Sequence, residues 1–266
     1  MTGASSGIGA AVVRALAQEG ARVVAVARSQ ERLDDLICGC PAGAVVAKLC
    51  DLRDAAQVRR LVDEAVSELG RLNILVNGAG VAFQEPVLSV TDEAWQETLA
   101  VNLTAPFFVA QQAARHMVAA GGGCIVNVAS IDALLADAPF VHYSVSKAGL
   151  VMMTKAIAYE LGHLNVRCNA VAPGVTVTPM TTAAMDAGDG PSGVLEANLR
   201  RIPLRRFSTA EEQAAVVLFL ASEESSFVNG ETIVADGGQV GGYWYLPQLE
   251  PPTSVSQGRY DRAART

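Results

Sequence analysis

Short apolar runs alternate with polar or amphipathic segments along most of the chain. The runs occupy residues 21–27, 44–49, 72–80, 124–130, 165–174 and 231–235. They are rich in valine and isoleucine, and nearly all of their positions are apolar. Strands buried on both faces of a parallel sheet have this pattern, whereas strands with one wet face alternate apolar and polar residues. Each run is therefore predicted to be a buried strand.

The segments between these runs are predicted to be helices. The clearest helical period lies in 54–69, with apolar residues spaced by three and four at Val58, Leu61, Val62, Ala65 and Leu69. Further helices are predicted at 10–19, which Gly20 stops, just after Arg28, from Thr91 or Asp92 to about Ala119, at 143–162 and at 209–222. Strands alternating with helices predict a doubly wound, Rossmann-like α/β fold with a parallel sheet in a single domain.

Two regions depart from this alternation. The segment 174–208 contains several glycines and prolines and no predicted strand. A loop of that length inside a compact domain is usually functional, so we expect a substrate loop or lid over the carboxyl edge of the sheet. Residues 241–266 are expected to form a loosely ordered tail. The predicted catalytic domain is therefore 1–240.

The chain begins with a glycine-rich stretch, Thr2-Gly3-Ala4-Ser5-Ser6-Gly7-Ile8-Gly9, that leads into a predicted helix. Glycines at these positions allow a tight turn and a close approach of a pyrophosphate. The free N–H groups and partial positive charge of the helix N-terminus would then bind it. The spacing differs from the common Gly-x-Gly-x-x-Gly fingerprint, and an ordinary glycine-rich turn is the alternative. No Gly-Lys-Ser/Thr follows, which disfavours a nucleoside triphosphate.

A loop of this kind normally follows a buried strand, and here only Met1 precedes it. The strands at 21–27 and 72–80 are then expected to face each other across a gap. Unpaired backbone groups inside such a gap would cost about 1–3 kcal/mol each. We therefore expect the fold to lack its first β-strand, and Met1 not to be the natural start of the protein.

Composition and charge narrow the class of protein. The 266 residues carry a formal net charge of −7, which argues against a nucleic-acid-binding surface. No apolar run reaches the roughly 20 residues that span a membrane. The five cysteines form no Cys-x-x-Cys pair and the three histidines have no visible ligand partners, so no metal site is predicted. A cytoplasmic protein with reduced thiols is expected.

A tyrosine and a lysine four residues apart, Tyr143 and Lys147, lie on one face of a predicted helix. Such a pair is also common on solvated helix faces. Ser130, however, stands at the end of a predicted strand, and the carboxyl ends of strands are where open parallel sheets bind ligands.

These features occur in the order found in short-chain dehydrogenases/reductases, and the chain resembles that family over residues 2 to about 238. The resemblance rests on Thr2-Gly3-x-x-x-Gly7-x-Gly9, Asp51, Asn77-Gly78-Ala79-Gly80, Asn102, Ser130, Tyr143-x-x-x-Lys147, Pro173-Gly174 and the closing Ala235-Asp236-Gly237-Gly238. It implies that Tyr143 is the general acid and base, that Lys147 lowers the Tyr143 pKa, and that Ser130 donates a hydrogen bond to the carbonyl oxygen. It further implies that Asn102 holds a proton-relay water.

The same resemblance implies a set of nicotinamide-cofactor contacts. Lys147 would also bind the nicotinamide ribose, Asp51 would contact the adenine, and Thr178 would contact the carboxamide. An acidic helix cap is the alternative for Asp51. Gly78 replaces the second asparagine of the family's turn. The full expected set is Gly3, Ser5, Ser6, Gly7, Ile8, Gly9, Arg28, Ser29, Asp51, Leu52, Asn77, Gly78, Ala79, Tyr143, Lys147, Pro173, Gly174, Thr176 and Thr178.

The end of the strand at 21–27 indicates which cofactor is used. An acidic residue there would bind the ribose 2′-hydroxyl of NAD(H) and repel a 2′-phosphate. The chain has Arg28 and Ser29 instead, which can hold the phosphate by charge-assisted hydrogen bonds. A solvated arginine is the alternative, although a helix start is a poor place for a cation. NADP(H) is therefore predicted over NAD(H).

The predicted function is NADP(H)-dependent interconversion of a carbonyl compound and a secondary alcohol. A catalytically silent cofactor-binding sensor or scaffold, or an inactive fragment, is the alternative. The helix at 143–162 is apolar around its whole circumference at 150–154, so one side is expected to pack against a second subunit in a homodimer or homotetramer. The small-molecule substrate and the direction of the reaction stay open.

Overall fold

A computed structural model describes residues 1–186 and 199–242. Its six strands, in chain order, are β1 (Val23–Ala27), β2 (Val45–Leu49), β3 (Ile74–Asn77), β4 (Gly123–Val128), β5 (Val166–Pro173) and β6 (Thr232–Ala235). The main helices are α1 (Gly7–Gln18), α2 (Gln30–Cys38), α3 (Ala55–Leu69), α4 (Asp92–Leu99), α5 (Ala105–Ala119), α6 (Val141–Leu161), α7 (Pro179–Asp186) and α9 (Ala210–Ala221). Every predicted strand is present, with boundaries shifted by a few residues.

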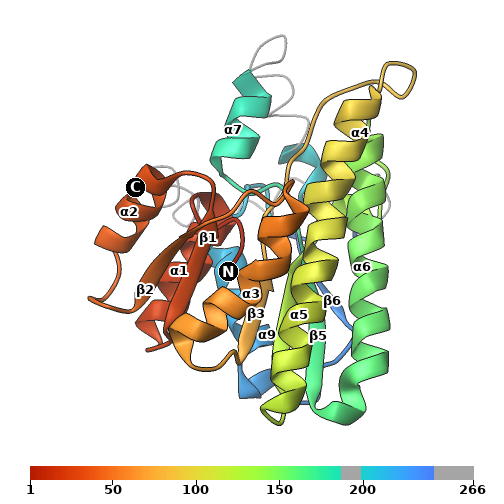
Figure 1. Ribbon diagram of the computed structural model, residues 1–266. Helices are drawn as coiled ribbons and strands as arrows, with labels where there is room; N and C mark the ends of the chain where they lie inside the picture. Colours follow the sequence, from red (N-terminus) through yellow and green to blue (C-terminus); the bar gives the residue numbers. More distant parts are fainter. Residues whose placement is uncertain (187–198, 243–266) are drawn as a thin grey trace, which may run out of the picture.

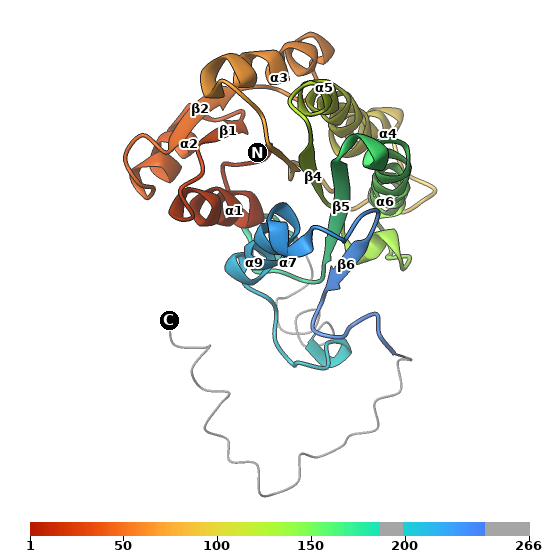
Figure 2. The same cartoon turned by 90° about the horizontal axis from the view of Figure 1, so that it is seen from below.

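All the strand pairs are parallel, which confirms the predicted doubly wound α/β fold. One group pairs β1 with β2, and the other runs β3-β4-β5-β6. Figure 2 shows the sheet between two helical layers, with α1 and α9 on one side and α3, α5 and α6 on the other. Because both faces are covered, β1 is buried at every position, which explains its unbroken apolar sequence.

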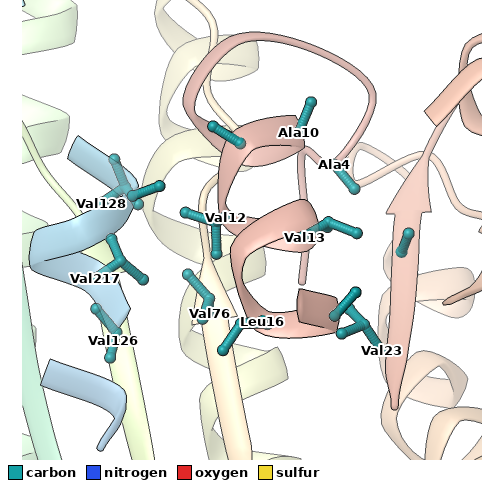
Figure 3. Packing of buried hydrophobic residues seen from close by; sticks show 14 of the residues in the cluster. Ala4, Ala10, Val12, Val13, Leu16, Val23, Val76, Val126, Val128 and Val217 are labelled. Atoms are coloured by element: carbon teal, nitrogen blue, oxygen red, sulfur yellow. The ribbon is translucent and has the colours of Figure 1, made fainter. Parts of the chain in front are cut away.

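Helix α1 holds the two groups of strands together on one face. Figure 3 shows its Val12 pointing toward Val76 of β3 and Val217 of α9, while Val13 points toward Val23 of β1. These side chains have a relative exposure of at most 6%. Apolar contacts from one helix to both strands thus fix where α1 begins, and with it the position of the glycine loop.

Between β1 and β3, the described residues form no strand, and only Thr2 bridges the two. Thr2 lies parallel to both Val26 and Asn77, and its N–H donates to the Val76 carbonyl at 3.0 Å. The rest of the interval is a cavity of about 340 Å³ with mostly apolar walls from β1, β3 and α3. The predicted gap is therefore confirmed. The short link through Thr2 still delivers the glycine loop to the carboxyl ends of the strands (Figures 1 and 2).

The long helix predicted from Thr91 to Ala119 is interrupted. Thr91 caps α4 by accepting the Ala94 N–H at 3.1 Å, as expected. A π-helical turn over Ala100–Thr104 then joins α4 to α5. Such turns insert one residue into the helical repeat, and they occur often at functional sites. Here the inserted turn carries Asn102, whose side chain is completely buried.

The predicted lid segment is closed at its base. Thr176 pairs with Ser208, their hydroxyl oxygens lie 2.8 Å apart, and the Val177 N–H donates to the Ser208 carbonyl at 2.9 Å. Helix α7 rises from this base beside the carboxyl ends of the strands (Figure 1). Part of the segment, 187–198, and part of the predicted tail, 243–266, lie outside the described residues.

Candidate active site

A cavity of about 340 Å³ lies where the carboxyl ends of the strands meet the glycine loop. Most of the residues expected from the sequence line it: Gly3, Ser5, Ser6, Gly7, Ile8, Gly9, Arg28, Asp51, Leu52, Gly78, Ala79, Ser130, Tyr143, Lys147, Pro173, Gly174, Thr176 and Thr178. Three expected residues, Ser29, Asn77 and Asn102, do not line it. Residues from five strand ends and from helices α1, α2, α6 and α7 thus converge on one space.

The glycine loop forms one wall, and its glycines are required by the geometry. Gly3 has φ +71°, and a Cβ there would lie 2.6 Å from the backbone nitrogen of Ala79. A Cβ on Gly9 would overlap the carbonyl oxygen of Gly3. Helix α1 begins at Gly7, and the Ser6 side chain makes no capping hydrogen bond to it. The first N–H groups of α1 are therefore offered to the cavity, an arrangement that fits a pyrophosphate.

Two arginines lie at the outer end of the cavity. Arg28 is exposed, and Arg32, four residues later on α2, also lines the space. Sequence reasoning missed Arg32, although its spacing from Arg28 places both on one side of a helix start. The Ser29 hydroxyl instead accepts the Arg32 N–H at 3.4 Å and caps α2.

Asp51 is held by a neighbour of opposite charge. Arg53 Nη2 lies 2.6 Å from Asp51 Oδ2, and this hydrogen-bonded pair keeps the Asp51 pKa below its usual value. The cap of α3 is not Asp51 but Asp54, which accepts the Ala56 N–H at 2.8 Å. Asp51 is therefore free of a capping role and faces the cavity as an ionised carboxylate.

The inner end of the cavity brings together Ser130, Tyr143 and Lys147. Ser130 follows β4 and begins a short 3₁₀ turn, Ile131–Ala133, while the other two stand one turn apart on α6. Lys147 is buried, and its Nζ donates to the Val128 carbonyl at 2.8 Å. The same Nζ lies 5.6 Å from the centroid of the Tyr143 ring. The last carbonyl of β4 thus fixes the ammonium beside the phenol.

The protonation of this pair is governed by burial. Burial raises the pKa of Tyr143 well above its ordinary value, Asp132 raises it further, and Ser130 opposes both. Burial lowers the pKa of Lys147 to about 8, against the influence of Asp132. Lys147 is not among the groups that set this direction, so its expected lowering of the Tyr143 pKa stays a prediction. Because burial disfavours a phenolate, Tyr143 stays protonated at neutral pH.

Asn102 and Asn77 are structural neighbours of the cavity rather than part of its wall. Asn102 bonds the N–H and the carbonyl of Val81, both at 2.9 Å, and donates to Ser146 Oγ at 3.0 Å. It therefore ties the loop after β3 to α6, next to Lys147. Asn77 donates to Asn127 Oδ1 at 2.9 Å and joins β3 to β4 inside the sheet.

The replacement of an asparagine by Gly78 has a steric explanation. A Cβ at this position would meet the Met1 side chain and lie 3.1 Å from the Thr2 carbonyl oxygen. The Gly78 N–H donates to Thr2 Oγ1 at 3.2 Å, so the backbone turn that the resemblance implies is kept.

Asp132 is a further charged group of this centre that sequence reasoning missed. It stands two residues after Ser130, and its pKa is raised to about 6 by burial and then by Asp137. Only its position next to the serine could have signalled it, because an acidic residue in a turn is usually solvated.

The described residues contain neither a metal-ligand cluster nor a membrane-spanning helix. Residues 1–186 and 199–242 contain no group of three His, Cys, Asp or Glu side chains arranged to hold a metal. None of the helices in the same ranges has the length and apolar character needed to cross a bilayer.

Comparison with known proteins shows what this chain is similar to. A family model described as enoyl-(acyl carrier protein) reductase matches residues 3–239. The chain is 42% identical to a 3-oxoacyl-[acyl-carrier-protein] reductase of Thermotoga maritima, over 90% of this chain and 96% of that protein. It is 41% identical to a D-threitol dehydrogenase of Mycolicibacterium smegmatis, over 90% of each. A gluconate 5-dehydrogenase from Burkholderia cenocepacia, solved with NADP and tartrate, matches with a TM-score of 0.83 at 33% identity, over 91% of this chain and 94% of that one.

Proposed function

Since this chain belongs to the short-chain dehydrogenase/reductase family and is an NAD(P)-dependent oxidoreductase of carbonyl and alcohol groups, we propose that it uses NADP(H) and that Tyr143 is its general acid and base. The observation that carries this proposal is the convergence of Ser130, Tyr143 and Lys147 at one end of a cavity whose other end is the glycine loop. The three side chains are those that proton transfer to a carbonyl oxygen requires.

Reduction needs a hydride at the carbonyl carbon and a proton at its oxygen. The nicotinamide of the bound cofactor supplies the hydride. Tyr143, kept protonated by burial, donates its proton to the carbonyl oxygen as the bond to carbon forms. The Ser130 hydroxyl donates a hydrogen bond to the same oxygen while negative charge develops there. Alcohol oxidation runs the same steps in reverse, with the Tyr143 phenolate accepting the proton.

The residues around Tyr143 keep it in position and compensate the charge it develops. Lys147, held by the Val128 carbonyl, supplies positive charge beside the phenol oxygen when the proton leaves. Asn102 fixes Val81, which lines the cavity, and bonds Ser146 on α6, one residue before Lys147. The role of Asn102 in holding a relay water stays a prediction.

The preference for NADP(H) is supported by two arginines at the outer end of the cavity. Arg28 and Arg32 both line it, and no acidic residue occupies the end of β1 where a ribose 2′-hydroxyl would be bound. A guanidinium binds a phosphate with charge-assisted hydrogen bonds, and two of them can share one phosphate. The Ser29 hydroxyl caps α2 and does not line the cavity, so its contact with the phosphate stays a prediction.

A homo-oligomer is part of the proposal. Met152 and Tyr159 on α6 are 63% and 94% exposed, and Phe107 on α5 is 40% exposed. These apolar side chains lie on the two helices that stand side by side on one face of the molecule (Figures 1 and 2). A second copy of the chain would bury them, and light scattering coupled to gel filtration would give the subunit number; a monomer would contradict this part. All five cysteines are free thiols, and a reducing, cytoplasmic compartment stays a prediction.

The test of the function is direct turnover. NADPH oxidation is followed on addition of a panel of diketones, quinones, sugars and acyl thioesters, and the reverse reaction is tested with polyols and NADP. Turnover of at least one carbonyl compound is expected. Saturable NADPH binding without turnover of any panel member would favour the alternative, a cofactor-binding sensor or scaffold.

A further inference from the structure

Two half-buried threonines where α7 begins, Thr178 and Thr181, line the same cavity as Ser130 and Tyr143. The Thr178 hydroxyl is the group expected to contact the cofactor carboxamide. A Cβ built on Gly7 would lie 3.0 Å from the Thr178 methyl carbon, so this methyl group packs against the glycine loop. Because a threonine side chain branches at Cβ, the position of its methyl group also fixes that of its hydroxyl.

The Thr181 hydroxyl is surrounded by groups that direct its hydrogen to a backbone carbonyl. Its oxygen lies 2.5 Å from the Thr176 carbonyl oxygen and 2.9 Å from the Thr178 carbonyl oxygen. A carbonyl oxygen only accepts, so the Thr181 hydroxyl is the donor in these contacts. The Thr178 backbone N–H donates to the Thr181 oxygen at 2.9 Å and fills one of its two acceptor positions. One acceptor position of Thr181 remains.

The direction of the hydrogen bond between the two hydroxyls follows from this count. Their oxygens lie 2.9 Å apart, and the Thr181 hydrogen is already used, so the Thr178 hydroxyl is the donor. The Thr178 oxygen then has only acceptor positions to offer. The Thr181 N–H approaches it at 3.4 Å and takes one of them. One lone pair of Thr178 therefore remains for a hydrogen-bond donor in the cavity.

Building on the proposed function, we propose that Thr181 is a positioning residue that makes Thr178 a hydrogen-bond acceptor toward the cofactor ring. The amino group of a carboxamide has two hydrogens to donate, and the free lone pair of Thr178 accepts one of them. An acetyl group at the same place on the ring has no such hydrogen and leaves the lone pair unpaired. Thr181 thus selects a ring that carries an amino group over one that carries a methyl group there.

The experiment compares the binding of two oxidised dinucleotides by isothermal titration calorimetry. One is NADP, and the other is its 3-acetylpyridine analogue, in which a methyl group replaces the amino group of the carboxamide. Wild type is expected to bind NADP about tenfold more tightly, because the acetyl group cannot donate to Thr178. A third ligand, the thionicotinamide analogue, keeps the amino group and should bind like NADP. If it binds as weakly as the acetylpyridine analogue, the amino group is not what is recognised and the proposal is wrong.

Two variants of Thr181 test its role. Thr181→Val keeps the branched shape but removes the hydroxyl, so Thr178 is free to turn its hydrogen toward the cavity. The ratio of the two Kd values, acetylpyridine analogue over NADP, should then fall to within about twofold of unity. Thr181→Ser keeps the hydroxyl and should retain the wild-type ratio. A general disturbance of the turn would raise both Kd values and leave their ratio unchanged, so an unchanged ratio in Thr181→Val overturns the proposal.

The matched control is Thr182→Val, one residue further along α7. The Thr182 hydroxyl donates to the carbonyls of Thr178 and Pro179 at 3.1 and 3.2 Å, so its removal takes bonds from the same turn but leaves the bond between the Thr178 and Thr181 hydroxyls in place. This variant should keep the wild-type ratio. An equal loss of preference in Thr182→Val and Thr181→Val would assign the preference to the turn as a whole and would also overturn the proposal.

Failure of this inference and failure of the proposed function give different results. The Kd ratio needs no turnover, so the expected ratios in a protein that reduces no carbonyl compound would keep the role of Thr181 and refute the proposed function. Turnover of a carbonyl compound with NADPH, together with equal wild-type affinity for NADP and the acetylpyridine analogue, would keep the function and refute the role of Thr181.

Discussion

The two ends of the cavity are built on different physical grounds. At the nucleotide end, the wall is backbone: the glycine loop, the N–H groups of α1, and exposed arginines around them. At the catalytic end, the wall is side chains: Lys147 and Ser130 are buried, burial lowers the pKa of Lys147 to about 8, and the Val128 carbonyl holds its Nζ. Shape therefore decides binding at one end, whereas desolvation decides reactivity at the other. A substitution at each end should change a different measured quantity.

The largest effect is expected from Tyr143→Phe at the catalytic end. Loss of a positioned general acid lowers kcat by about 10²- to 10⁴-fold. The Kd for NADPH, measured by fluorescence titration, should stay within about twofold, because the nucleotide end is untouched. Turnover close to that of wild type would remove Tyr143 from the mechanism. A parallel loss of NADPH binding would break the separation between the two ends.

Gly9→Ala, at the nucleotide end, is expected to weaken NADPH binding. The new Cβ would overlap the Gly3 carbonyl, so the loop must move away from its phosphate-binding shape. Overpacking of this kind costs about 1–3 kcal/mol, which corresponds to a roughly 5- to 150-fold rise in the Kd for NADPH. The matched control is Gly39→Ala, where the nearest atom to a Cβ, the Leu36 carbonyl oxygen, is 3.6 Å away. Equal affinities in the two variants would mean that the loop does not bind the cofactor.

A smaller and selective effect is expected from Arg28→Asp. The carboxylate repels a 2′-phosphate and can accept a bond from a ribose hydroxyl, so the ratio of kcat/KM for NADPH to that for NADH should fall by about tenfold or more. Arg115→Asp, on the exposed side of α5, makes the same change in net charge away from the cavity. If both variants change the ratio equally, the effect is one of overall charge, and Arg28 is only a solvated residue.

The smallest effect is expected remote from both ends. Thr91→Ala removes the cap of α4 and should lower the free energy of unfolding by about 1 kcal/mol. Neither kcat nor the Kd for NADPH should change, since Thr91 touches neither end. Denaturant unfolding and the two assays above measure this directly. A change in kcat comparable to that of Tyr143→Phe would show that stability, and not chemistry, dominates these measurements.

Much of the fold could be predicted because its signals are local. The fully apolar run at β1 specifies a strand covered on both faces, and the spacing in 54–69 specifies the buried side of α3. The π-helical turn at Asn102 was missed, because one inserted residue leaves no local mark in an apolar helical pattern. The Asn77 side chain was expected to contact the cofactor, but it bonds Asn127 inside the sheet. This was missed because Asn127 is 50 residues away and belongs to the neighbouring strand β4.

The residues of the site also fall into those that the sequence predicted and those that it did not. Ser130, Tyr143 and Lys147 were singled out from their order along the chain, and the structure brings them to one cavity. Arg32 and Asp132 were not, because their relevance depends on which way a helix start and a turn face. The direction of the Tyr143 pKa could not be read from the spacing of Tyr143 and Lys147 either. Desolvation depends on everything packed around a group, whereas spacing reports one neighbour.

The sequence by itself determined the alternation of strands and helices, the glycine loop and the identity of the reactive side chains, because each depends on residues close together in the chain. Only the tertiary structure decided that Thr2 bridges β1 and β3, that Arg32 joins Arg28 at the cavity, and that Ser130 meets Tyr143 and Lys147 in one space. These relations arise where segments distant in sequence exclude water together. Burial and hydrogen-bond competition are properties of that shared space, and no single segment carries them.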